Sequence, residues 1–340
     1  MKRKKKILNL VQKAYSENRR IIAPLAGFPG CGLIGSSIKL TQQNHGLHFS
    51  CINSLFKLFA PDVAFMMMDL SVEANALGLP VRFPTHESSS VEKHPLENIH
   101  ELDHYRRINI LQDARIHSYI KTMELTATAL PKDILKCAYI VGPVTLAGLL
   151  ESAQRVATDS ILEPERLSRL CEFSTELIQK YALAMVNAGA DIICILEPTA
   201  AILGPNEFKR FSGNYVDRIM ESYKYSEVET IYHVCGNTMH LVKEMASTGV
   251  TGLSLDAPET GVDMVKAAEM IPEDVILIGN VSPTRVLVDA SVAEVKKVTT
   301  ELLKDMRPYP NFILSTGCDL PPETPIENIK AFMDAGRNFK

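Results

Sequence analysis

The repeating unit of this chain is clearest in residues 230–256, TIYHVCGNTMHLVKEMASTGVTGLSLD. A β-branched apolar run, TIYHVCG (230–236), is followed by a segment with helical periodicity, TMHLVKEMASTG (238–249), and then by a second apolar run, GLSLD (252–256). Short, continuously apolar runs are typical of strands that are buried on both faces of a parallel sheet. The stretch therefore predicts a strand, a helix and a second strand parallel to the first.

The same alternation extends along the chain. Eight apolar runs, each bounded by Gly, Pro or Asp, predict strands at 21–27, 63–69, 137–143, 191–198, 230–236, 252–256, 275–280 and 312–318. Segments with helical periodicity lie between them, the clearest at 168–190, 238–249, 261–271 and 292–306. Eight alternating strands and helices are the pattern of a (β/α)8 TIM barrel, an α/β fold.

We therefore predict a single TIM-barrel domain that spans residues 1–340. Residues 1–20 are expected to form an N-terminal helical extension. Long insertions follow the first two strands, and the polar segment 81–110 is expected to lie as a loop layer over the C-terminal face of the barrel.

Composition narrows the class of protein. The chain has 340 residues, of which 46% are hydrophobic and 22% charged, so it can bury a large core. Its net charge of -4 argues against nucleic acid as the main partner, because phosphate binding needs a basic surface. The sequence shows no apolar run that could cross a membrane and no signal-peptide pattern, which predicts a cytoplasmic protein without a membrane partner. Seven scattered cysteines do not suggest a disulfide framework.

Residues suited to chemistry fall at the predicted strand ends. They are Asp69, Glu197, His233, Cys235, Asp256, Asn280, Cys318 and Asp319. Active sites of TIM barrels form at the C-terminal ends of the strands, so these side chains are expected to face one mouth.

His233, Cys235 and Cys318 form the most specific pattern among them. Side chains at positions i and i+2 of a strand share a face, so His233 and Cys235 project together, and Cys318 arrives from the end of the last strand. Three soft ligands with a free fourth position are typical of catalytic zinc. The alternative is a core histidine with two buried cysteines. The placement of all three residues at strand ends favours the metal site.

Four motifs connect the chain to a known family. They are HVCGN at 233–237, VILIGNVSP at 275–283, STGCDLPPETPIENIKAF at 315–332 and, more weakly, MDLSVEANALG at 68–78. On these motifs the chain resembles the uroporphyrinogen decarboxylase superfamily, and within it the zinc-dependent methylcobamide:coenzyme M methyltransferases. The resemblance covers most of the chain, from the second predicted strand to the C-terminus.

The resemblance implies a ligand set and a reaction. His233, Cys235 and Cys318 would bind Zn²⁺, and Asp256 would be a weak fourth ligand. A methyl group would pass from a methylated corrinoid to a small thiol such as coenzyme M, and zinc would keep that thiol deprotonated. The corrinoid would arrive on a partner protein that docks on the C-terminal face of the barrel.

The resemblance leaves other activities open. The Gly-rich segment 24–44, PLAGFPGCGLIGSSIKLTQQN, departs from the family pattern, so the thiol is not determined. A tetrapyrrole decarboxylase is an alternative, although the Arg-rich segment of the decarboxylases is missing. A corrinoid-dependent demethylase, tetrahydrofolate or homocysteine as acceptor, and a non-catalytic corrinoid-binding barrel are further alternatives.

Four residues carry smaller hypotheses. Asp69 would orient the substrate or take up a proton, or else cap a helix. Glu197 would hydrogen-bond a zinc-bound group. Asn280 would support the cofactor-binding mouth through backbone contacts, and Met68 would offer a soft apolar wall to the corrin or pack in the core.

Six histidines of the first half are expected to face solvent: His45, His48, His86, His94, His100 and His104.

Overall fold

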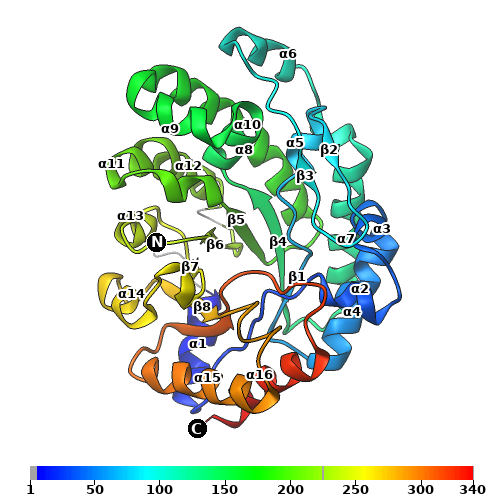
Figure 1. Ribbon diagram of the computed structural model, residues 1–340, viewed down its shortest axis with the longest axis vertical. Helices are drawn as coiled ribbons and strands as arrows, with labels where there is room; N and C mark the ends of the chain where they lie inside the picture. The colour runs from blue at the N-terminus through cyan, green and yellow to red at the C-terminus, as the bar shows by residue number, and fades with distance from the viewer. Residues whose placement is uncertain (1–5, 224–225, 340) are drawn as a thin grey trace.

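A parallel sheet forms the centre of the molecule (Figure 1). The structure is a computed structural model that describes residues 6–223 and 226–339. In that part of the chain the sheet has seven strands, in the order β1 (Val63–Phe65), β4 (Leu135–Val141), β5 (Ile192–Leu196), β6 (Glu229–Val234), β7 (Gly252–Leu255), β8 (Ile276–Val281) and β9 (Phe312–Thr316). All neighbours pair in parallel. All their residues are buried, as continuously apolar runs predict.

The predicted first strand, 21–27, closes this sheet. It is an extended segment with one bridge, between Ile22 and Leu314 of β9. The Ala23 amide donates to the Leu314 carbonyl at 2.9 Å, and on the other side the amide of Asp62, next to β1, donates to the Ile22 carbonyl at 3.0 Å. The segment thus joins β9 to β1, and the predicted TIM-barrel fold is confirmed, with its first strand reduced to a bridge.

Helices surround the strands (Figure 1). The larger ones are α4 (His45–Phe59), α7 (Ala114–Ala129), α8 (Pro143–Glu151), α9 (Ala153–Leu162), α10 (Pro164–Asn187), α12 (Asn214–Glu221), α14 (Met264–Met270), α15 (Val292–Asp305) and α16 (Ile326–Asn338). Shorter ones are α2 (Pro29–Leu33), α3 (Ile38–Gln43), α5 (Val72–Ala76), α11 (Pro205–Phe208) and α13 (Val242–Ser247). The helix predicted at 238–249 is shorter than expected, because residues 239–241 form a turn and α13 spans only Val242–Ser247.

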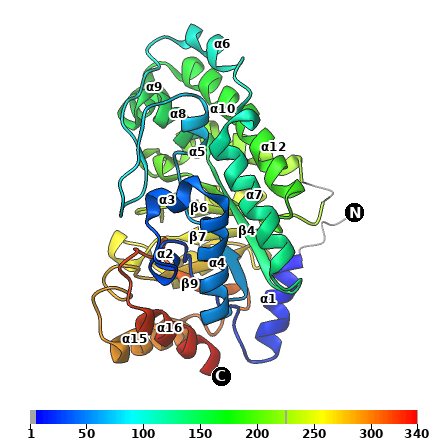
Figure 2. The ribbon, with the colours of Figure 1, turned by 90° about the vertical axis from the view of Figure 1, so that its right-hand side faces the viewer.

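The two ends of the barrel carry different segments (Figure 2). Helix α1 (Lys6–Ser16) lies at the N-terminal ends of the strands, where the Ile7 amide donates to the buried Glu229 carboxylate at 3.3 Å. Residues 1–5 of the predicted extension lie outside the described residues, and the single domain stays a prediction.

The polar insertion lies toward the opposite end. It contains a two-stranded hairpin, β2 (Val81–Arg82) and β3 (Ser90–Val91), followed by helix α6 (Leu102–Tyr105). Ser89 hydrogen-bonds Asp69, which follows β1, so the hairpin approaches the C-terminal ends of the strands. Among the described residues, no helix combines the length and the apolar character that crossing a bilayer requires.

Candidate metal centre

The structure brings His233, Cys235 and Cys318 together. His233 lies in β6 and is fully buried, Cys235 follows the same strand, and Cys318 lies just after β9. Their ligand atoms all lie within 4.8 Å of one another. His233 Nε2 is 3.1 Å from Cys235 Sγ and 3.8 Å from Cys318 Sγ, and the two sulfur atoms are 3.7 Å apart. Two distant strand ends therefore present one compact set of donors.

Backbone packing explains how β9 reaches β6. A Cβ atom at Gly317 would overlap the backbone of Ala257, which follows β7. Only glycine permits this close approach, which lays the loop with Cys318 against the end of β7 and next to β6. Gly236 turns the chain immediately after Cys235 with a φ of 87°.

A neighbouring strand orients the imidazole of His233. Ser254 of β7 is paired in register with His233, and its Oγ lies 3.0 Å from His233 Nδ1. A proton on Nδ1 that is donated to this hydroxyl leaves the Nε2 lone pair directed at the two sulfur atoms. Metal-binding histidines are commonly held in this way through their second ring nitrogen.

The donor set fits zinc. With Zn–S bonds of about 2.3 Å and Zn–N bonds of about 2.0 Å, a tetrahedral ion holds its sulfur ligands about 3.8 Å apart and its sulfur and nitrogen ligands about 3.5 Å apart. The observed separations are 3.7 Å between the sulfurs and 3.1 and 3.8 Å between nitrogen and sulfur. The three residues therefore need little movement to occupy three corners of a tetrahedron.

The metal-free group holds protons that a cation would displace. Burial lowers the pKa of His233, but Cys318, Cys194 and Asp256 together outweigh it and raise this pKa to about 9. The hydrogen bond with Cys235, followed by burial, raises the pKa of Cys318 well above its ordinary value. Because metal ligands must be deprotonated, binding of a divalent cation here would release protons.

Asp256 and Asn280 lie beside this group. Asp256 is outside the set of donors within 4.8 Å. Its two carboxylate oxygens accept hydrogen bonds of 2.6 Å from the amides of Gly236 and Ala257. Asn280 is buried and donates from Nδ2 to the Asp256 carbonyl at 2.9 Å. Asp256 therefore stiffens the turn after Cys235, and Asn280 supports it through the backbone.

Glu197 caps a helix. Its fully buried carboxylate accepts from the amides of Val144 and Thr145 at 2.9 and 2.8 Å and from Ser212 Oγ at 2.8 Å. These amides begin α8, so the carboxylate satisfies donors that a helix leaves free at its N-terminus. Burial raises the pKa of Glu197, and its hydrogen bonds lower it. A Cβ atom at Gly142 would overlap this carboxylate.

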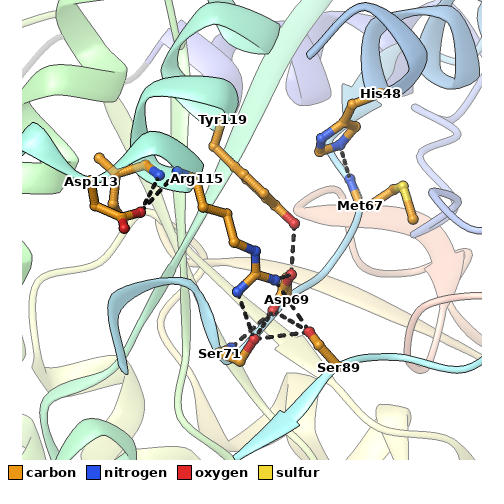
Figure 3. Close-up of polar contacts among 9 residues, drawn as sticks. His48, Met67, Asp69, Ser71, Ser89, Asp113, Arg115 and Tyr119 are labelled. Carbon is orange, nitrogen blue, oxygen red and sulfur yellow. Dashed lines mark hydrogen bonds and ion pairs between the residues drawn. The ribbon is translucent and has the colours of Figure 1, made fainter. Parts of the chain in front are cut away.

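Asp69 is the centre of a buried polar network (Figure 3). Its carboxylate forms an ion pair with Arg115 of α7 and accepts from Tyr119 Oη at 2.6 Å. Oδ1 also accepts from Ser71 Oγ at 2.8 Å and from Ser89 Oγ at 3.0 Å. With both oxygens occupied, Asp69 connects the end of β1 to α7 and to the hairpin of the insertion.

A hydrogen bond joins Met68 to Asp319. Met68 is half-buried against the main core, and its amide donates to Asp319 Oδ2 at 3.2 Å. Asp319 Oδ1 accepts from the Gly27 amide at 3.0 Å. Burial raises the pKa of Asp319 to about 7, although three backbone hydrogen bonds lower it. Asp319 thus connects the ends of segment 21–27, β1 and β9.

Two features were not foreseen from the sequence. His48 is 1% exposed, so its expected solvent-side position is wrong; its Nε2 accepts from the Met67 amide at 3.0 Å (Figure 3). Ser254, the partner of His233, was also missed. The pattern of the strand could have found it, because Ser254 is the polar residue two positions before Asp256 and shares its face.

Comparisons with known proteins show the family and the fold of the chain. The model of the uroporphyrinogen decarboxylase (URO-D) family matches residues 35–339. The methylcobamide:CoM methyltransferase MtbA of Methanosarcina acetivorans is 26% identical over 280 residues, which cover 80% of this chain and 78% of that protein. A uroporphyrinogen decarboxylase of Prochlorococcus marinus is 26% identical over 317 residues, which cover 89% of this chain and 87% of that protein.

A solved structure is similar over nearly the whole chain. It is a methyltransferase from Methanosarcina mazei, with a TM-score of 0.84 and 25% sequence identity. The match covers 97% of this chain and 98% of that protein.

Proposed function

The chain belongs to the uroporphyrinogen decarboxylase family, and we propose that it is a zinc-dependent methyltransferase that moves a methyl group from a methylated corrinoid to a small thiol, coenzyme M or a related compound. The observation that carries the proposal is the group of His233, Cys235 and Cys318 at the barrel mouth. The similarity to a methylcobamide:CoM methyltransferase and to a solved methyltransferase supports it.

Each residue of the group has a role in this proposal. His233 Nε2 and the sulfur atoms of Cys235 and Cys318 would hold the zinc, and Ser254 would accept a hydrogen bond from Nδ1 and so keep the imidazole in the metal-binding tautomer. Bound zinc would lower the pKa of a coordinated substrate thiol and so supply a thiolate at neutral pH. Two cysteine thiolates balance the charge of the ion, which keeps an added sulfur electron-rich.

Other residues shape the mouth around the group. Asp256 is proposed as a weak fourth ligand, for which it would have to give up its hydrogen bond from Gly236 or Ala257. Asp69 and Glu197 are proposed to act by positioning, because their carboxylates are fully engaged with Arg115 and with the start of α8. Asn280 and Met68 are proposed to line the corrinoid side of the mouth.

The corrinoid is proposed to arrive on a partner protein that docks on the C-terminal face. A corrin ring is too large for a barrel interior that is filled with side chains. The strand ends with the three donors lie on that face, so the docked corrinoid and the thiol would meet there. We propose a cytoplasmic enzyme with no nucleic-acid or membrane partner.

Metal analysis and a transfer assay test the proposal. We expect purified enzyme to hold one zinc ion per chain and to methylate coenzyme M from methylcobalamin. Cys235→Ala and Cys318→Ala should lose both the zinc and the transfer, whereas Cys171→Ser, at a buried cysteine of α10, should keep both. Full zinc content in either alanine variant would disprove the site.

Decarboxylation of a tetrapyrrole is the second candidate. The similarity to the Prochlorococcus enzyme favours it. A porphyrinogen carries many carboxylates, but Arg115, a buried arginine near the mouth, is already neutralised by Asp69. Decarboxylation of uroporphyrinogen by a zinc-free protein, with no methyl transfer to coenzyme M, homocysteine or tetrahydrofolate, would establish this alternative.

A further inference from the structure

A second pair of cysteines lies outside the metal centre. Cys31 of α2 and Cys51 of α4 are both buried, and their sulfur atoms are 3.5 Å apart. They belong to a small apolar cluster with Phe28, Ile38 and Met67, separate from the main core. The pair therefore lies beside the barrel core and not within it.

The two thiols differ chemically. Cys51 donates its S–H to Cys31 Sγ, and Cys31 lies 3.6 Å from Thr41 Oγ1. This hydrogen bond from Cys51 lowers the pKa of Cys31 to about 7, against the opposing effect of burial. The same hydrogen bond, followed by burial, raises the pKa of Cys51. Cys31 is thus the better nucleophile, and Cys51 is the thiol placed to react second.

The backbone around the pair favours bond formation. A disulfide needs its sulfur atoms about 2.05 Å apart, so the two must approach by roughly 1.5 Å. Helix α2 has only five residues, Pro29–Leu33, and rests directly on α4, because a Cβ atom at Gly30 would lie 2.8 Å from the Cys51 carbonyl oxygen. Because the two backbones are already in close contact, rotation of the Cys31 and Cys51 side chains, and not a shift of α2 toward α4, brings the sulfur atoms together.

We propose that Cys31 and Cys51 form a dithiol–disulfide site that is oxidised by a low-molecular-weight disulfide. The Cys31 thiolate attacks one sulfur of the oxidant, whose S–S bond breaks and releases one thiol. Cys51 then loses its proton and attacks Cys31 of the mixed disulfide, which releases the second thiol. Two electrons pass to the oxidant, and the protein gains one disulfide. The proposal does not depend on zinc or on methyl transfer.

The position of the pair connects it to the barrel mouth. Helix α2 begins two residues after Gly27, whose amide donates to Asp319 Oδ1. Asp319 directly follows Cys318. A disulfide between α2 and α4 would fix the segment that holds the Cys318 loop.

Peptide mapping of the full-length, zinc-loaded protein tests the proposal. Trypsin places Cys31 in peptide 21–39 and Cys51 in peptide 40–57, with one cysteine in each. After treatment with 2-hydroxyethyl disulfide near neutral pH, we expect these peptides to be linked, and dithiothreitol to separate them. Unchanged zinc content would show that Cys235 and Cys318 did not react.

Cys137 and Cys194 are the internal control. They are in contact on the neighbouring strands β4 and β5, but strand pairing holds them, and burial raises the pKa of Cys137. We expect both to stay reduced. Linkage of their peptides as fast as that of 21–39 and 40–57 would overturn the proposal, because reactivity would then be nonspecific.

Two variants separate the roles of the thiols. Cys51→Ser should accumulate a stable mixed disulfide on Cys31, roughly tenfold faster than lone buried Cys171 is modified, because Cys31 has more thiolate. Cys31→Ser should leave Cys51 unmodified. Wild-type peptides 21–39 and 40–57 that stay reduced in excess oxidant would refute the proposal without any variant, whether or not the variants fold.

Discussion

At the scale of single residues, the neighbours of the candidate ligands decide what those ligands can do. His233 binds a metal through Nε2 only when Nδ1 holds the proton, and Ser254 Oγ of the adjacent strand is placed to accept a hydrogen bond from Nδ1. Asp69 and Glu197, by contrast, are carboxylates at strand ends, where a catalytic role would place them, but buried donors occupy their oxygens. The chemistry that each of these side chains can perform therefore depends on its hydrogen-bond partners.

Removal of the Ser254 hydroxyl should weaken metal binding. We expect Ser254→Ala to lower zinc affinity about 10- to 100-fold, as loss of such a partner typically does, and Ser254→Thr to restore most of it. Competition with a chromophoric chelator measures the affinity. Ser315→Ala is the matched control, because Ser315 is a buried strand serine whose hydroxyl donates to the Ala23 carbonyl. Equal affinities of Ser254→Ala and wild type would contradict the assigned role.

His48 should make stability sensitive to acid. Burial is the main cause that lowers its pKa to about 3, and nearby Asp69 and Arg115 have smaller, opposite effects. The unfolded chain takes up this proton near pH 6.5, so the stabilising contribution is complete above that pH and is lost as pH falls toward 3. We expect a loss of up to about 1.4 kcal/mol per pH unit from this group.

Urea unfolding between neutral pH and the onset of acid denaturation measures this effect. His48→Gln keeps an acceptor for the Met67 amide but does not titrate, so its unfolding free energy should fall less steeply with acid. Identical slopes for variant and wild type would show that His48 is not the responsible group.

At the scale of elements, a buried ion pair between Asp69 and Arg115 is one of the contacts that hold the insertion after β1, beside the exposed pair between Arg106 and Glu176. Arg115 and Asp69 side chains are 6% and 1% exposed, and Ser89 brings the hairpin to the same carboxylate. The ring of Phe83, from the hairpin segment, lies over the Arg115 guanidinium, with the ring centroid 4.7 Å from Arg115 Cζ. Helix α7, strand β1 and the hairpin therefore depend on each other.

Loss of the Asp69 charge should release the hairpin. Asp69→Asn leaves Arg115 buried without a counter-charge, and we expect a loss of about 3–5 kcal/mol in unfolding free energy. Amide exchange in residues 81–91 should accelerate more than in β4–β9. Glu124→Gln, which breaks the exposed Lys121–Glu124 pair on the same helix, should change stability by less than about 1 kcal/mol. Unchanged amide exchange in residues 81–91 would contradict the inference that Asp69 holds the hairpin.

At the scale of the whole molecule, the sequence predicts local elements better than contacts between residues far apart in the chain. The strands from β4 to β9 were predicted because each is a continuously apolar run, and the group of His233, Cys235 and Cys318 followed from strand spacing and strand ends. The partners of Asp69 could not be read in this way. Arg115 and Tyr119 lie 46 and 50 residues away within a helix, and nothing in the helix pattern indicates which polar residue turns inward.

Closure of the barrel depends on Asp62. Its carboxylate accepts from the Ile22 amide at 2.8 Å and pairs with Arg19, while its own amide donates to the Ile22 carbonyl. Asp62→Ala leaves the Ile22 amide without an acceptor, so we expect a loss of about 1–3 kcal/mol in global unfolding free energy. Asp62→Asn keeps an acceptor and should lose less. Urea denaturation followed by circular dichroism distinguishes the two, and equal losses would contradict this explanation.

The bridge between Ile22 and Leu314 also sets an order of events during synthesis. Residue 22 is made well before its partner in β9, as the separation of 292 residues between Ala23 and Ser315 illustrates. Until then the nascent chain holds an open sheet with unpaired edges, the kind of surface that chaperones cover. The ring is completed only after β9 has been synthesised.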